Sequence, residues 1–143
     1  MLNQNIKVQV QVKTWKEAIA EAGALLVTAG SCTQDYVGAM IEAVMELGPY
    51  MVLTPHVALA HSRPSQAVKK SDISLVVLKH PIKFNHEAHD PVKLVFAFCA
   101  TSSDEHVALL EQLATYLSDS TTVEHLVTAK TVPDLLKVLN KQL

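Results

Sequence analysis

Glycine is scarce in this chain of 143 residues, which contains only Gly23, Gly30, Gly38 and Gly48. A phosphate-binding Walker loop or a dinucleotide fingerprint needs several closely spaced glycines, and these four cannot form either motif. The sequence also lacks a Gly-x-Ser-x-Gly elbow and a His-Glu-x-x-His zinc helix. Ordinary kinases and dehydrogenases are therefore poor candidates.

Cysteine is limited to Cys32 and Cys99, which lie far apart in the sequence and fit no metal-binding or redox spacing. Cys99 ends an apolar run, so we expect a buried thiol. Cys32 lies beside a predicted helix start, and we expect a bystander. These positions indicate no disulfide framework.

Charge of one sign is not in excess, because 12 basic and 14 acidic side chains give a formal charge of −2. The basic residues cluster only at Lys69-Lys70, with Lys79 and Lys83 nearby. Nucleic-acid binding needs a larger basic surface with aromatic or helical readers, so we expect no nucleic-acid partner.

Long hydrophobic runs are also missing. The uncharged stretch at residues 47–62 is too short to span a membrane and contains two prolines and two histidines. The first five residues lack a charged region followed by an apolar run, so they do not form a signal peptide. We therefore expect a cytoplasmic protein with no direct membrane insertion.

The apolar patterns predict strands between helices. A strict alternation at residues 8–12 and a nearly continuous apolar run at 92–100 are typical of a half-buried and a central strand, respectively. The full set of predicted strands comprises residues 8–12, 50–53, 57–60, 73–78 and 92–100, with His80-Pro81 ending the fourth. The close spacing between residues 50 and 80 indicates that part of the sheet is antiparallel.

Helix signals occupy the remaining segments. The capping box at Thr14-Trp15-Lys16-Glu17 opens a helix that ends near Gly30. Thr33 can cap a second helix that Gly48 ends, and Ser103 or Asp104 can cap a third. Leu126-Val127 fits a short strand or a helix end, and a last helix runs from Pro133 through Leu139. The sequence predicts one layered α/β domain over residues 1–143.

Histidine is unusually frequent, with seven residues, and two kinds of chemistry compete for them. His86 and His89 have a spacing that chelates metal on a helix, but Asp90-Pro91 follows directly and favours a loop. A neutral imidazole is also a nucleophile near neutral pH, and His61 has small neighbours that leave its ring accessible. A single histidine in a folded domain is nevertheless most often structural or on the surface.

A phosphoimidazole at His61 would need hydrogen-bond donors nearby. Ser62 and Arg63 are the local candidates, for a hydrogen bond and for a phosphoryl or partner contact. His106, at a predicted helix start, is a distant candidate that would meet the positive end of the helix dipole. His56 lies five residues before His61, so an unbroken strand would direct the two side chains to opposite faces.

The order of these segments resembles the enzyme IIA components of the bacterial sugar phosphotransferase system, in the mannitol/fructose-type superfamily and its ascorbate-type branch. The segment Ala58-Leu59-Ala60-His61-Ser62-Arg63-Pro64 is similar to the active-site segment, and Ser103-Asp104-Glu105-His106 to the second histidine segment. Further similar segments are residues 48–53, 68–70, 78–81, 84–87 and 90–92. The resemblance covers essentially the whole chain.

The resemblance implies a phosphotransferase mechanism without cofactor or metal. His61 would accept a phosphoryl group from the phosphocarrier protein HPr, on Nε2, while His106 stabilises that group. A cysteine of a cognate IIB component would receive it next. A membrane IIC component would couple transfer to uptake of L-ascorbate or a related sugar. The implied fold is a mixed sheet of about five strands, flanked by helices on both sides.

Two positions depart from the family pattern. A glycine is usual at His56, which matters if the backbone there has a positive φ, and a proline often stands at Ala60. Two other functions stay open: a regulatory IIA-like domain that binds partners according to phosphorylation, and a histidine-rich metal-binding module. The sequence does not identify the sugar or decide whether the protein is a homodimer.

Overall fold

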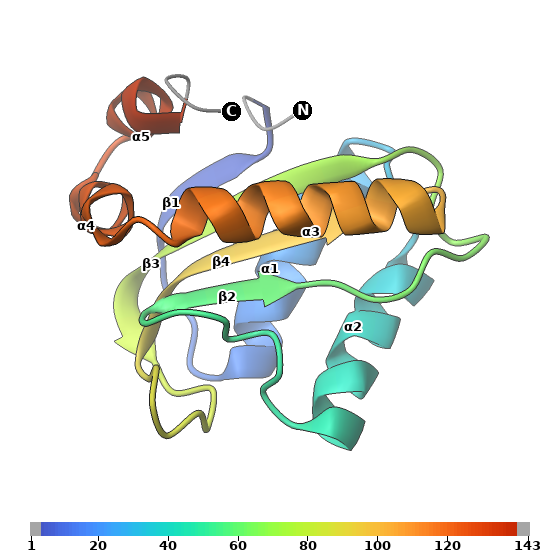
Figure 1. Ribbon diagram of the computed structural model, residues 1–143, viewed down its shortest axis with the longest axis horizontal. Coiled ribbons are helices and arrows are strands. Elements are labelled where there is room, and N and C mark those ends of the chain that lie inside the picture. Colours follow the sequence, from blue (N-terminus) through green and yellow to red (C-terminus); the bar gives the residue numbers. More distant parts are fainter. Residues whose placement is uncertain (1–3, 140–143) are drawn as a thin grey trace.

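The computed structural model describes residues 4–139, which form a mixed β-sheet between two layers of helices (Figure 1). The sheet has the strand order β1-β3-β4-β2. Its strands are β1 (Ile6–Val10), β2 (Val57–Ala60), β3 (Asp72–Ile82) and β4 (Val92–Cys99). The central β3 and β4 are antiparallel, whereas β1 on β3 and β2 on β4 are parallel. The predicted α/β class with a partly antiparallel sheet is confirmed.

Helices cover both faces of this sheet, as expected. Helices α1 (Trp15–Thr28) and α2 (Gln34–Leu47) lie on one face, and α3 (Ser103–Leu117) crosses the other (Figure 1). The chain ends with α4 (Ser120–Thr128) and α5 (Val132–Leu139), which pack on the α3 side. Among the described residues, no helix is long and apolar enough to cross a membrane.

The alternation of side chains along β4 divides the core into two halves. Val95, Ala97 and Cys99 pack against α1 and α2, whereas Phe96 and Phe98 pack against α3. Successive residues of a strand point to opposite faces, so a strand covered on both sides is apolar throughout. This is why the sequence of β4 reads as a continuous hydrophobic run.

The helix ends follow the predicted signals with one change. The Thr14 side chain accepts a hydrogen bond from the Glu17 amide, and Gly48 ends α2 with a φ of 82°. Helix α3 is capped by Ser102, whose hydroxyl accepts from the Glu105 amide, rather than by Ser103 or Asp104. An extended Ser102 with its own side-chain oxygen satisfies a free amide of the first turn.

Three details of the predicted strands were wrong. Residues 50–53 form a turn and coil segment, so the described residues contain four paired strands rather than about five. Strand β3 continues past His80-Pro81 to Ile82, because the pairing with β4 is irregular there and a proline at an irregularity removes no regular ladder bond. The first strand begins and ends two residues earlier than predicted. Of the two interpretations of residues 126–127, the helix end is confirmed, because they lie in the last turn of α4.

Candidate functional site

His61 directly follows β2, at the end of the sheet where β2 and β4 run parallel. Ala60 pairs with Ala97 across these strands, so the next residues, His61 and Phe98, become neighbours. The His61 ring stacks on the Phe98 ring, with centroids 5.0 Å apart and planes 18° apart. The parallel pairing of two strands thus places the imidazole on an aromatic face.

A backbone carbonyl fixes the tautomer of His61. Its Nδ1 lies 2.6 Å from the Leu59 carbonyl oxygen. Because a carbonyl oxygen only accepts hydrogen bonds, Nδ1 carries the proton in this contact. The neutral ring then keeps its lone pair on Nε2, which is the nitrogen available for attack on an electrophile.

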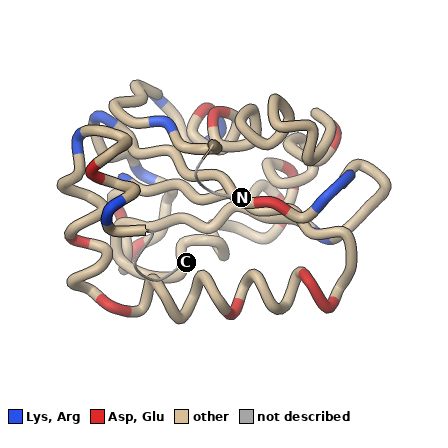
Figure 2. Tube along the Cα trace, turned by 90° about the horizontal axis from the view of Figure 1, so that it is seen from above, with Lys and Arg blue, Asp and Glu red and all other residues tan. Residues whose placement is uncertain are grey.

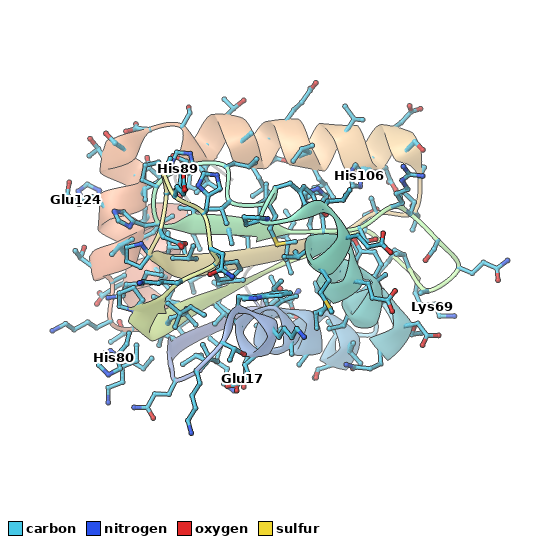
Figure 3. All side chains as sticks on the ribbon, turned by 90° about the horizontal axis from the view of Figure 1, so that it is seen from below. Glu17, Lys69, His80, His89, His106 and Glu124 are labelled. Atoms are coloured by element: carbon cyan, nitrogen blue, oxygen red, sulfur yellow. The ribbon has the colours of Figure 1, made fainter. Side chains whose placement is uncertain are left out.

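His106 lies in the first turn of α3, on the side that faces the sheet (Figure 3). Its ring centroid is 5.4 Å from that of His61, with the planes at 63°, and 5.2 Å from that of Phe98. Its Nδ1 is buried and has no hydrogen-bond partner among residues 4–139. A buried polar atom without a hydrogen-bond partner is costly. This nitrogen can therefore form its hydrogen bond with a group that enters the site.

Burial favours the neutral form of both imidazoles. Desolvation lowers the pKa of His61, a change that the Leu59 hydrogen bond opposes and the nearby His106 reinforces. Desolvation also lowers the pKa of His106 below its ordinary value. Two neutral rings avoid mutual repulsion, and a neutral imidazole is the nucleophilic form.

Two tyrosines that the sequence did not single out hold the backbone around His61. Tyr50 donates a hydrogen bond to the His61 carbonyl over 3.1 Å, and its ring meets the His61 ring edge-on at 5.4 Å. The buried Tyr36 hydroxyl donates to the Phe98 carbonyl over 2.8 Å and accepts from the Ser62 amide over 2.9 Å. Burial raises the pKa of Tyr36, which keeps this hydroxyl protonated.

Tyr36 had only its helical spacing as a signal in the sequence. That spacing, with Met40 and Val44, predicts a core position, and the side chain is 1% exposed. Its hydroxyl nevertheless reaches two backbone segments far away in the chain. A tyrosine rather than a phenylalanine on an apolar stripe is the one sequence feature that points to such a hydrogen bond.

Ser62 and Arg63 both line the site, but they differ from the expectation in detail. Ser62 is held through its backbone amide, and its hydroxyl has no hydrogen-bond partner among residues 4–139. Arg63 is exposed and takes part in no ion pair of the described part of the chain. Both groups are thus available to an incoming molecule.

A hydrogen-bonded cluster fixes the start of α3 beside His106. The Glu105 carboxylate accepts from the Thr101 hydroxyl and, over 2.7 Å, from the Ser71 hydroxyl. The hydrogen bond from Thr101 lowers the pKa of Glu105 most, and the bond from Ser71 lowers it further. Ser71 in turn accepts from the Thr101 amide over 3.1 Å. The cluster joins the start of α3 to the segment before β3.

His61 and His106 lie in the wall of an open cleft of about 550 Å³. Its lining residues are Ala43, Glu46, Leu47, Tyr50, His61, Ser62, Arg63 and His106. Leu47 is 70% exposed at the cleft, and Met45 and Val107, beside lining residues in sequence, are 62% and 50% exposed. Of these three exposed apolar side chains, Leu47 lines the cleft itself.

Arg63 is the single lysine or arginine among these lining residues. Helix α3 carries Asp104, Glu105 and Glu111 but no lysine or arginine, as Figure 2 shows along its length. An anion in the cleft would therefore depend on Arg63, on the neutral imidazoles and on the amides at the start of α3.

The histidines considered for metal binding lie elsewhere. His86 and His89 stack with ring centroids 4.5 Å apart, and His86 Nδ1 accepts from the His89 amide over 3.2 Å. Figure 3 shows His89 near the end of the molecule opposite to His106. Within residues 4–139, no three histidine, cysteine or acidic side chains converge to hold a metal ion.

His56 also lies outside the cleft, in the connection before β2. Its φ is 72°, the left-handed region that a glycine adopts without strain. The ring nitrogen Nδ1 lies 2.9 Å from the Pro91 carbonyl oxygen, and the His56 amide donates to the His89 backbone carbonyl over 3.1 Å. The backbone there has the conformation for which the family's usual glycine is suited.

Solved structures with this fold include IIA proteins of sugar phosphotransferase systems and a nitrogen regulatory protein IIA-Ntr from Neisseria meningitidis, which superposes with a TM-score of 0.82 at 26% identity, over 96% of this chain and 95% of that one. IIA mannitol from Escherichia coli superposes with a TM-score of 0.84 at 28% identity, over 95% of this chain and 96% of that one. A complex of enzyme IIA and phosphorylated enzyme IIB of the mannitol system from the same organism gives 0.78 at 26%, over 96% and 95%. The fold is therefore that of a IIA domain.

The chain belongs to the family of EIIA 2 components of the phosphoenolpyruvate-dependent sugar phosphotransferase system, whose model matches residues 1–142. It is 33% identical over 140 residues to an ascorbate-specific EIIA component of Salmonella choleraesuis, covering 97% of this chain and 91% of that protein. The resemblance stated from the sequence is confirmed. Membership assigns the chain to a sugar phosphotransferase system as a transferase component.

Proposed function

We propose that His61 is the phosphoryl carrier of this protein and accepts the group from a phosphohistidine of HPr on Nε2. The observation that carries the proposal is the 2.6 Å contact between His61 Nδ1 and the Leu59 carbonyl, which leaves the Nε2 lone pair free. The second support is the open cleft that His61 shares with His106.

In the proposed step, His61 Nε2 attacks the phosphorus in line with the bond to the departing imidazole. The new N–P bond forms as the old one breaks, and the imidazole of HPr leaves with the electron pair and takes up a proton. The His61 Nδ1 hydrogen bond to Leu59 becomes stronger as positive charge develops on the ring. The cation that forms is thus stabilised by a group already in place.

His106 is proposed to stabilise the phosphoryl group from across the cleft. Its ring is adjacent to that of His61, and a nitrogen without a partner can donate to a phosphoryl oxygen. Arg63 is the charged donor of the cleft and Ser62 is a neutral one. The exposed apolar side chains Met45, Leu47 and Val107 would form the surface on which HPr docks.

The phosphoryl group is then proposed to pass to a cysteine of a cognate IIB component. A solved relative of similar fold was determined in complex with phosphorylated IIB, which supports such a partner for this chain. A membrane IIC component would couple the transfer to sugar uptake. The ascorbate-specific relatives favour L-ascorbate or a related compound as the sugar.

The direct test incubates the protein with phosphoenolpyruvate, enzyme I and HPr and measures its mass. We expect one added phosphoryl group that is labile in acid, and no addition in His61→Ala. His125→Ala is a matched control, because His125 is exposed on α4 and does not line the cleft. A folded wild-type protein that stays unphosphorylated would contradict the proposal.

A second measurement separates transport from regulation. The phosphorylated protein is mixed with the cytoplasmic IIB domain, and the appearance of a phosphocysteine on IIB is followed. Transfer supports the transport role proposed here. Stable phosphorylation without transfer to any IIB would instead favour the regulatory IIA-like domain.

A further inference from the structure

A single peptide unit next to the His61 ring is held at both ends by tyrosine hydroxyls. Strand β2 ends at Ala60, so the peptide unit that joins His61 to Ser62 lies beyond the strand. Tyr50 donates to its carbonyl oxygen over 3.1 Å, and its amide donates to the Tyr36 hydroxyl over 2.9 Å. Because a peptide unit is planar, the two hydroxyls fix its orientation and thereby the backbone that carries the His61 side chain.

Tyr50 also contacts the imidazole of His61 directly. The two ring centroids lie 5.4 Å apart with planes at 83°, while Phe98 stacks on the same imidazole at 5.0 Å and 18°. Edge-to-face and stacked rings are the favoured arrangements of aromatic pairs. Together with the 2.6 Å contact between His61 Nδ1 and the Leu59 carbonyl oxygen, these two contacts restrict rotation of the imidazole.

Tyr50 differs from a core tyrosine in its exposure. It is 36% exposed and lines the cleft, whereas Tyr36 is 1% exposed. It lies in the turn after α2, where its own amide donates to the Gly48 carbonyl over 2.8 Å. Burial raises the pKa of Tyr50, so its hydroxyl stays protonated and donates at neutral pH. A side chain with this exposure contributes little to the core, so stability alone does not explain its two contacts with His61.

We propose that Tyr50 is a positioning residue for His61: its hydroxyl fixes the His61 carbonyl, and its ring holds the imidazole in the orientation that keeps Nδ1 on the Leu59 carbonyl. Nε2 then meets the phosphorus in one orientation. Tyr50 itself does not donate to the phosphoryl group, because its single hydroxyl proton is engaged by the His61 carbonyl. This role rests on the proposed function of His61.

The same peptide unit leads into the segment that carries the two other donors of the cleft. Ser62 and Arg63 follow it directly in the chain, and both line the cleft. A peptide unit free to turn would displace these donors together with the imidazole. The hydroxyl of Tyr50 therefore acts on the nucleophile and on its surroundings through one hydrogen bond.

Two substitutions separate the hydroxyl from the ring. Tyr50→Phe removes the hydroxyl and keeps the ring, so we expect phosphoryl acceptance to be about fivefold slower, as for the loss of one ordinary hydrogen bond. Tyr50→Leu removes the aromatic contact as well, and we expect acceptance to be about twentyfold slower. Both variants should fold, because the position is partly exposed.

The experiment measures acceptance by rapid quench at several concentrations of phosphorylated HPr. We expect a lower maximal rate in both variants, with a half-saturating concentration of HPr within about twofold of the wild type. Tyr116→Phe is the matched control, because Tyr116 also donates to a backbone carbonyl but does not line the cleft. A change confined to the half-saturating concentration would make Tyr50 a docking contact only and would overturn the positioning role.

The second readout is the tautomer of His61, taken from the nitrogen chemical shifts of its ring in the unphosphorylated protein. We expect the proton on Nδ1 in the wild type and exchange between both tautomers in Tyr50→Leu, with the exposed His125 as an internal reference. An unchanged tautomer in Tyr50→Leu, or a maximal rate within about twofold of the wild type in both variants, would overturn the role.

The two readouts also separate this role from the proposed function. If the folded wild type accepts no phosphoryl group, the proposed function of His61 fails, whereas the tautomer still tests whether Tyr50 orients the ring. If Tyr50→Leu does not fold, the maximal rate of Tyr50→Phe decides, because that variant keeps the ring and loses only the hydroxyl.

Discussion

The rings of His61 and Phe98 lie face to face, with centroids 5.0 Å apart and planes 18° apart. This contact follows from the pairing of β2 with β4, because parallel strands bring their carboxyl ends to the same edge. The His61 ring is therefore held at the ends of two paired strands, directly after β2. A side chain held in this way would lose little freedom in the proposed reaction with a phosphoryl donor.

Phe98→Leu tests the aromatic support of His61. Leucine keeps most of the apolar burial, so the free energy of unfolding should fall by about 1–2 kcal/mol. The stacking face disappears, and phosphoryl acceptance at His61 should slow more than stability alone explains. Phe96→Leu is the matched control, because Phe96 is equally buried on the same face of β4. Urea unfolding and rapid-quench phosphorylation check both; equal rates in the two variants would contradict the idea.

Tyr36→Phe tests the hydroxyl that joins the end of β4 to the segment after His61. The substitution leaves the Ser62 amide and the Phe98 carbonyl without this partner, which should cost about 1–3 kcal/mol of unfolding free energy. Tyr116→Phe removes only a long 3.4 Å bond to the Val138 carbonyl and should cost less. Chemical denaturation measures both, and a similar loss in the two variants would argue against a special role for Tyr36.

The sequence predicted the fold class and the candidate histidines, because both depend on local patterns and ordered segments. It did not predict Tyr36, Tyr50 or Phe98 as parts of the site, since those contacts depend on which strands pair and how helices pack. Residues 50–53 have strand-like composition, yet they form no paired strand; of the backbone hydrogen bonds given for this segment, that from the Leu59 amide to the Met51 carbonyl joins it to β2. Whether this segment forms a strand depends on long-range pairing rather than on its composition.

His106→Ala tests the second histidine of the cleft. If His106 donates to the phosphoryl group as the transition state forms, its removal should slow acceptance by roughly 10²–10³-fold. The ring is only partly buried, so the fold should change little. The rate is measured by rapid quench with phosphorylated HPr, and His125→Ala should behave as wild type. A rate for His106→Ala within about twofold of wild type would exclude the donor role, by the usual conversion of rates to free energies.

The lowered pKa values of His61 and His106 predict a direction for stability with pH. Burial favours the neutral rings in the fold, whereas the unfolded chain protonates them below about pH 6.5. Their contribution to stability is therefore complete above that pH and is lost as pH falls through the lower folded values. Urea unfolding across this range should show a smaller acid-induced loss in His61→Asn than in the wild type. An equal loss in both would show that the His61 pKa is not lowered, and titration by NMR gives the values directly.

His56 offers a way to separate backbone strain from side-chain contact. Its φ of 72° is costly for any residue with a Cβ, and its ring contacts the Pro91 carbonyl. His56→Ala removes the ring contact but keeps the Cβ, so it should lose stability. His56→Gly removes both the ring and the strain, and it should be more stable than His56→Ala by about 1 kcal/mol. Because His56 does not line the cleft, both variants should accept the phosphoryl group at the wild-type rate. Equal unfolding free energies for the two variants would mean that the backbone at His56 carries no strain. A histidine in place of the family's usual glycine would then cost no stability.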